Sequence, residues 1–201
     1  MSSLELIMKQ LGNKETLQQL GQSVNAKPTK VKKATELGIS TLMEALNRNT
    51  NTQEGAEALA KALEQHQDDD VDDISSFLKK VDTNDGAKII EHILGGKSKS
   101  VQAKLAKQTG MDSDQIGKLL IQFAPMILSL LGKKKKEENL DANGVSNITS
   151  SLSSLLGAGS SGNNLLGLAS SFLDDDDNGA GGIGGNIGGI LGGLGSLFKK
   201  K

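Results

Sequence analysis

The chain has 201 residues, of which 36% are hydrophobic and 2% aromatic, and its 23 basic and 24 acidic residues give a formal net charge of −1. A core with so few aromatic side chains must be aliphatic, which favours helices over strands. The lack of Trp, of Tyr and of a basic excess argues against nucleic-acid binding, which needs stacking rings and cations. The lack of Cys excludes disulfides, thiolate nucleophiles and cysteine-ligated metals.

The opening residues, MSSLELIMKQLG, do not resemble a secretory signal, which has a basic start, an apolar run and a small-residue cleavage site. We therefore expect a cytoplasmic protein. Apolar spacing and cap residues then predict a series of helices. Asn51, with Glu54 three residues later, is the predicted capping box of the third helix. The expected helices cover residues 3–12, 27–48, 52–66, 71–80, 86–94 and 100–110.

The most apolar segment is MDSDQIGKLLIQFAPMILSLLG, with Asp112 as the expected cap and Gln115 at the matching third position. Its apolar part, residues 116–131, is shorter than the roughly 20 residues that a membrane span needs. We predict a buried central helix that is kinked at Pro125. The charged run GKKKKEE that follows is expected to be a solvated linker.

The two halves of the chain also match each other at an offset of 85 residues. Residues 20–46 align with residues 105–131, so that Leu20 pairs with Leu105, Val31 with Ile116 and Leu42 with Ile127. Each copy would contain a short helix, a turn and a long helix. The pattern indicates a duplicated helical unit, although shared helical period alone can produce such a match.

Glycine divides the chain, with 10 glycines in the first 140 residues and 15 in the last 61. We therefore predict an all-α multihelical bundle over residues 1–135 and a Ser/Gly/Asn-rich linker with short helices over residues 136–173. An acidic loop and a Gly-rich amphiphilic tail are predicted over residues 174–201.

The segments LELIMKQLG, NTQEGAEALAKALEQH, DGAKIIEHILGGK and MDSDQIGKLLIQFAPMILSLLG together resemble the YidB-like bacterial proteins, a domain of unknown function. The resemblance covers about residues 1–135. It implies a small all-helical bacterial protein and brings no established activity. Members of the family often end in an Asp–Gly loop and a Gly-rich apolar tail, which the end of this chain is similar to.

Two histidines stand near the ends of short predicted helices. His66 precedes an acidic run that includes Asp69 and Asp70, and His92 follows Asp85 on a similar segment. If the two helices packed together, these side chains would form a polar cluster suited to metal binding or acid–base chemistry. The alternative is that the aspartates cap a helix and each His lies at a helix end. We favour this structural role, because no tight His spacing preorganises a site.

Asp174, Asp176 and Asn178 occupy positions one, three and five of a calcium-binding loop, with Gly179 at position six. Position twelve is Gly185, where a bidentate acid is required. These three residues would give at most a weak calcium site, and an acidic flexible run is the favoured reading. Beyond them, Ile and Leu recur at helical spacing among glycines and end in three lysines.

These patterns lead to one favoured function and two alternatives. The favoured one is a non-catalytic helical interaction or scaffold protein that self-associates, binds an unknown protein partner, or contacts the inner membrane peripherally through its Gly-rich tail. The first alternative is weak divalent-ion binding, with calcium as the only candidate cofactor. The second is an uncharacterised hydrolase, which requires His66 and His92 to be adjacent in a cleft.

Overall fold

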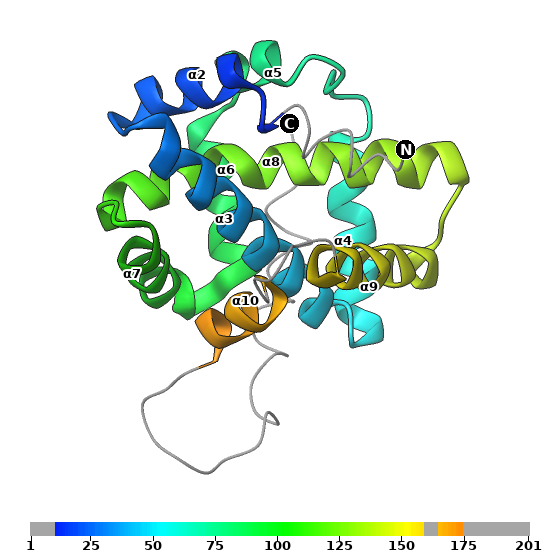
Figure 1. Cartoon of the computed structure of the whole chain (residues 1–201). Coiled ribbons are helices and arrows are strands. Elements are labelled where there is room, and N and C mark those ends of the chain that lie inside the picture. Colours follow the sequence, from blue (N-terminus) through cyan, green and yellow to red (C-terminus); the bar gives the residue numbers. More distant parts are fainter. Residues whose placement is uncertain (1–10, 159–164, 175–201) are drawn as a thin grey trace.

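The computed structural model describes residues 11–158 and 165–174, and it shows helices and no strands in these ranges (Figure 1). The predicted all-α multihelical fold is therefore confirmed. The helices are α2 Lys14–Val24, α3 Pro28–Asn49, α4 Gln53–His66, α5 Ile74–Lys80, α6 Thr83–Leu94, α7 Ser98–Thr109, α8 Ser113–Glu138, α9 Ala142–Ala158 and α10 Leu165–Leu173, with a 3-10 turn at Gly95–Lys97.

Local signals explain most of the helix boundaries. Asp112 begins α8, and the Gln115 side chain accepts a hydrogen bond from the Asp112 backbone N–H at 3.1 Å, as predicted. Gly110 closes α7 in the left-handed conformation with φ of 66°, which glycine adopts without steric cost. The cap of α4 differs from the prediction by one residue. Thr52, and not Asn51, accepts a bond from the Gly55 N–H.

One further prediction needs correction. The lysine run after Leu131 is not a linker, because α8 continues without interruption to Glu138. Helix α2 was predicted by the repeat alignment alone, and it is present with eleven residues. The first predicted helix, residues 3–12, lies almost entirely outside the described residues.

Helix α8 passes through Pro125 as one helix and is buried there. Proline has no N–H, so it cannot donate the usual hydrogen bond to the Ile121 carbonyl four residues earlier. Helix α6 packs against this part of α8, and a Cβ built on Gly86 would lie only 2.2 Å from the Ile121 oxygen. The backbone of α6 thus approaches α8 most closely where Pro125 leaves a carbonyl without its helical donor.

The internal repeat is confirmed at the level of helix order and caps. Helices α2 and α7 end in left-handed residues, Asn25 and Gly110, that are 85 positions apart, and α3 and α8 begin three positions after them. Contacts between the copies are reciprocal. Lys30 Nζ donates to the Gly110 carbonyl, and Gln115 Nε2, 85 positions after Lys30, donates to the Asn25 carbonyl at 2.8 Å. The two units are therefore related by an approximate two-fold axis.

The long helices α3 and α8 cross near this axis (Figure 1). Gly38 of α3 lies at the crossing, where an added Cβ would meet Leu120 at 3.2 Å and Phe123 at 3.6 Å. Phe123 is the repeat partner of Gly38 and is fully buried. One small and one large side chain at equivalent positions let the two helices pack closely at their shared centre.

Helices α9 and α10 pack on α3, below the crossing in the view of Figure 1. Their apolar residues Val145, Ala169, Phe172 and Leu173 are buried and join the same hydrophobic core or its edge. In the first unit, α4 and α6 pack on α8 in the corresponding way. The residues after position 135, predicted as a linker with short helices, thus supply helices that complete the second unit.

Candidate functional site

His66 lies between two carboxylates at the end of α4. Its Nδ1 is 3.1 Å from Asp69 Oδ2, and its Nε2 is 3.9 Å from Asp85 Oδ2 at the start of α6. Ser129, fully buried on α8, donates to the same Asp69 oxygen at 2.7 Å. The fold thus gathers four polar side chains from three segments, the end of α4 with the loop after it, the start of α6, and α8. We call His66, Asp69, Asp85 and Ser129 the His66 group.

The His66 group has the residue types of a catalytic triad but not its connectivity. In a triad the nucleophile contacts the imidazole, and the carboxylate orients the imidazole from the far side. Here the carboxylate of Asp69 stands between Ser129 and His66. The Ser129 hydroxyl also contacts the Pro125 carbonyl at 2.8 Å, inside its own helix. Ser129 and Asp69 therefore attach the end of α4 to α8, and this arrangement does not activate a nucleophile.

The other two members of the predicted polar cluster lie elsewhere. Asp70 is exposed and accepts a hydrogen bond from the Asp72 N–H at 3.2 Å, which closes a local turn. His92 is half-buried in the last turn of α6. Asp85, which His66 approaches, is seven residues before His92 on this helix, a rise of about 10 Å. His66 thus contacts the start of α6, whereas His92 belongs to its last turn, and of the four members of the His66 group the sequence did not indicate Ser129.

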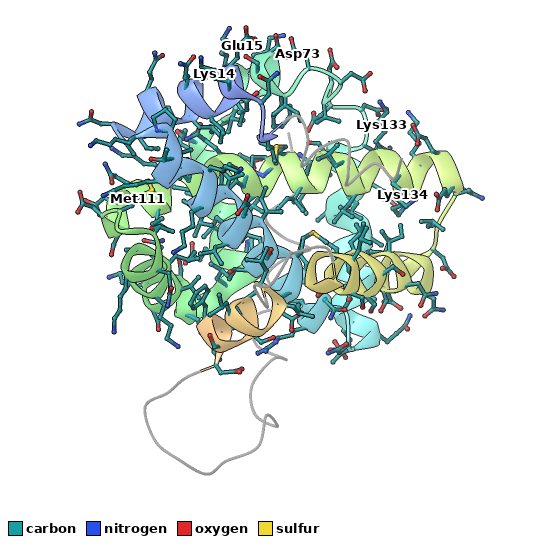
Figure 2. The ribbon with its side chains drawn as sticks, viewed as in Figure 1. Lys14, Glu15, Asp73, Met111, Lys133 and Lys134 are labelled. Atoms are coloured by element: carbon teal, nitrogen blue, oxygen red, sulfur yellow. The ribbon has the colours of Figure 1, made fainter. Side chains whose placement is uncertain are left out.

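The acidic run after His66 is paired with the lysine run at the end of α8. Lys133, labelled in Figure 2, bonds Asp72 at 2.6 Å. Lys136 contacts Asp68, and Lys135 bonds Glu64 of α4 at 3.0 Å. The hydrogen bond to Asp72 raises the pKa of Lys133. Two runs of opposite charge, 60 or more residues apart in sequence, thus neutralise each other. Exposed pairs contribute little stability singly, so their effect is to position the loop.

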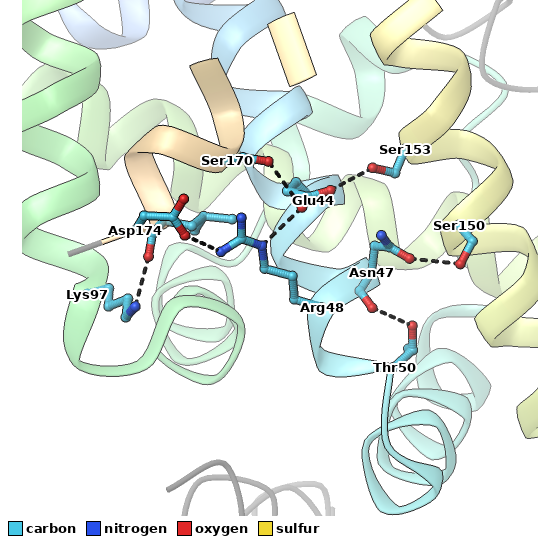
Figure 3. A network of polar contacts seen from close by, with 10 residues as sticks. Glu44, Asn47, Arg48, Thr50, Lys97, Ser150, Ser153, Ser170 and Asp174 are labelled. Carbon is cyan, nitrogen blue, oxygen red and sulfur yellow. Dashed lines mark hydrogen bonds and ion pairs between the residues drawn. The ribbon is translucent and has the colours of Figure 1, made fainter. Parts of the chain in front are cut away.

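A second polar cluster was not predicted from the sequence. Glu44 of α3 is 8% exposed, and it accepts hydrogen bonds from Ser153 of α9 at 2.8 Å and Ser170 of α10 at 3.3 Å (Figure 3). Arg48, one turn later, bonds Glu44 at 3.0 Å. A buried carboxylate must be compensated, and three donors do so here. The cluster fixes α9 and α10 to α3.

Glu44 is the repeat partner of Ser129, so the two polar clusters occupy equivalent places in the two units. Ser129 lies on α8, on which α4 and α6 pack. Glu44 lies on α3, on which α9 and α10 pack. The repeat alignment is the sequence signal that could have indicated these two residues. It pairs Glu44 with Ser129, and both are polar residues on helix faces that are otherwise apolar. It does not reveal their partners, which come from distant segments.

Asp174 is the last residue that the structure describes, and it is held by several cations. Its carboxylate bonds Arg48 at 2.7 Å, and its carbonyl accepts from Lys104 of α7 at 2.5 Å. Burial alone would lower the pKa of Arg48, but hydrogen bonds to Asp174 and Glu44 outweigh it and raise this pKa. Asp176 and Asn178, the other predicted calcium ligands, lie outside the described residues. The one placed ligand is thus already neutralised by an arginine.

No group of three or more His, Asp or Glu side chains in the described ranges is arranged to hold a metal ion. One described helix, α8, is long and apolar enough to cross a membrane by length and composition. Most of its apolar stretch is buried inside the bundle, so it has the properties of a core helix.

The comparisons with known proteins give a family and no activity. The family described as "Bacterial protein of unknown function (DUF937)" matches residues 5–134, well over half of the chain. The protein belongs to this family. The YidB-like resemblance drawn from the sequence is consistent with that membership. No curated protein and no solved structure matches this DUF937 member significantly. The matched segment ends before α9 and α10, although these helices complete the bundle of the DUF937 protein.

Proposed function

We propose that this DUF937 protein is a non-catalytic helical interaction protein that associates with itself or with a membrane through its Gly-rich tail. The observation that carries the proposal is the attachment of the chain directly before the tail. Phe172 and Leu173 are buried, and Asp174 is held by Arg48 and Lys104. The tail therefore starts from a fixed point on the surface of the bundle.

The distribution of apolar surface supports the same proposal. Among the described side chains, Leu155 is the one large hydrophobic residue that is exposed, at 41%. The bundle thus offers little apolar surface for association. The tail after Asp177 contains Ile, Leu and Phe at helical spacing among many glycines. Interior glycines cost a helix about 1 kcal/mol each relative to Ala, so such a segment needs a partner surface.

The non-catalytic part of the proposal is supported by the His66 group. Its serine contacts a carboxylate and a backbone carbonyl, and its histidine contacts the carboxylates of Asp69 and Asp85. The weak calcium role has less support, because the Asp174 carboxylate is paired with Arg48. The hydrolase role requires His66 and His92 to be adjacent. His66 contacts Asp85 at the start of α6, whereas His92 lies in the last turn of that helix.

The test compares the full chain with a variant that ends after Asp174. An earlier end would remove Phe172 and Leu173 from the core and unfold α10 for unrelated reasons. A matched full-length control replaces Leu191, Leu194 and Leu197 by Ser, which keeps the length, glycines and lysines of the tail. We expect light scattering or vesicle flotation to show assembly or membrane binding for the full chain alone. Equal monomeric masses without vesicle binding for all three proteins would refute the proposal.

A further inference from the structure

The net charge of −1 conceals an uneven distribution of charge over the surface. The acidic loop after α4 is neutralised by the lysines at the end of α8. By contrast, residues 27–33 and 97–109 contain eight lysines and no Asp or Glu. These two segments are the start of α3 and most of α7, and the two helices pack against each other. Positive charge is therefore concentrated on one side of the bundle.

Hydrogen bonds place four of these lysines along the two packed helices, and a fifth lies one turn further along α7. Lys30 and Lys33 of α3 donate to the Gly110 and Gln108 carbonyls at the end of α7, Lys33 at 2.6 Å. At the other end of α7, Lys97 donates to the Leu173 carbonyl at 2.8 Å (Figure 3). Lys104 donates to the Ser171 carbonyl at 3.1 Å. Lys107, exposed, lies one turn after Lys104. We call Lys30, Lys33, Lys97, Lys104 and Lys107 the lysine row.

The lysine row ends at the point where the tail begins. Lys104 also donates to the Asp174 carbonyl, the last described acceptor before the tail. Lys30 and Lys33 donate to backbone carbonyls, which complement an ammonium group without cancelling its full charge. The next carboxylate along α3 is that of Glu36. In the tail sequence, three aspartates follow Asp174, and the three lysines at the end of the tail equal them in number.

We propose that the lysine row is a docking surface for an anionic lipid membrane and that it acts together with the Gly-rich tail. This inference rests on the proposed function of the tail. Stable peripheral attachment generally takes two signals, such as an apolar element and a basic patch. Here the two are adjacent, because the row touches the residue from which the tail departs. A nucleic acid fits less well, since the described surface has no Trp or Tyr on which bases could stack.

The test measures vesicle binding by the full chain with Lys30, Lys33 and Lys107 changed to Gln. Lys97 and Lys104 are kept, because they hold α10. The matched control carries Lys79→Gln, Lys80→Gln and Lys88→Gln, which removes the same charge from exposed positions on α5 and α6. A lysine near an anionic surface contributes about fivefold in affinity, so three contribute on the order of 100-fold. We expect this loss with phosphatidylserine-containing vesicles for the first variant and a much smaller loss for the control.

Further arms keep the inference separate from the role of the tail. Lys107→Glu alone perturbs no described hydrogen bond, and we expect it to weaken binding about fivefold or more even where the triple variant folds poorly. Binding to neutral phosphatidylcholine vesicles should be weak, and binding to the anionic vesicles should fall as salt rises. If both triple variants bind anionic vesicles equally well, the lysine row is refuted while the tail keeps its role. Preferential binding of duplex DNA or RNA at 0.15 M salt would also overturn the inference.

Discussion

Replacement of Gly86 by Ala tests how closely α6 packs against the proline-containing part of α8. The new Cβ would lie 2.2 Å from the Ile121 carbonyl oxygen and 3.0 Å from Ile121 Cγ2. The first of these atoms belongs to the backbone of a buried helix, so it cannot move aside as a flexible side chain would. Restoring ordinary contact requires α6 and α8 to separate by about 1 Å, a gap that removes a quarter to a half of each dispersion contact across it.

The size of the effect follows from two opposing contributions. Overpacking a buried contact costs typically 1–3 kcal/mol, and a backbone obstacle places Gly86→Ala at about 3 kcal/mol. Alanine recovers about 1 kcal/mol through its better helix propensity. We therefore expect the free energy of unfolding to fall by about 2 kcal/mol, which corresponds to a decrease in Tm of roughly 4–8 °C for a protein of this size.

Thermal unfolding followed by circular dichroism, with urea titration as a second probe, measures the effect. Gly96→Ala is the matched control, because a Cβ at Gly96 would meet nothing within 4 Å. That change should leave stability unchanged or raise it by up to about 1 kcal/mol. The Gly86 variant should also alter the NMR signals of the His66 ring, since Asp85 moves with α6. A Gly86→Ala protein that melts at or above the temperature of Gly96→Ala would refute the proposed close packing.

Three further predictions concern the caps, the His66 group and the C-terminal helices. Asp73 caps α5, and hydrogen bonds from the Ser76 side chain and backbone lower the pKa of its carboxyl group. The stability that this cap gives α5 is present above the usual Asp range and is lost as pH falls through the lowered pKa. Asp73→Asn should remove this pH dependence from the amide exchange of α5, and an unchanged profile would contradict the cap. Ser129→Ala should lower the free energy of unfolding, measured by urea titration, by about 1 kcal/mol. The control Ser154→Ala, at an exposed position, should not change it. Equal urea midpoints for the two variants would contradict the attachment of Ser129 to Asp69. A chain that ends after Glu138 should lose several kcal/mol of stability relative to one that ends after Asp174, because it lacks four buried apolar residues of α9 and α10; comparable melting temperatures would mean that the family-matched segment folds alone.

Much of the fold was predictable because the signals are local. Apolar residues at helical spacing, the Asp112–Gln115 capping box and Gly110 gave the position and order of most helices. The failures also have local causes. The lysine run was predicted as a solvated linker because Glu137 and Glu138 directly follow it. In the structure α8 continues through the run, and Asp68, Asp72 and Glu64 pair with its lysines.

The candidate site was less predictable than the fold. The sequence indicated His66 and Asp69, which are three residues apart and bond within one turn. It did not indicate Ser129, because a polar residue on a helix carries no mark of the partner that it meets. His92 was grouped with His66 on the similarity of two segments, and the packing of α6 placed them apart.

The sequence by itself determined the class of fold, the duplicated arrangement of a short and a long helix, the family and the amphiphilic character of the tail. Tertiary structure decided that α9 and α10 complete the second unit, that Glu44 and Ser129 each anchor neighbouring helices, and that lysines from α3 and α7 form one row beside the tail. The physical reason is that helical period and capping depend on residues within a few positions of one another. Contacts across the approximate two-fold axis join residues 80 to 90 positions apart, as in Lys30 with Gly110 and Asn25 with Gln115, and form only once both units have folded.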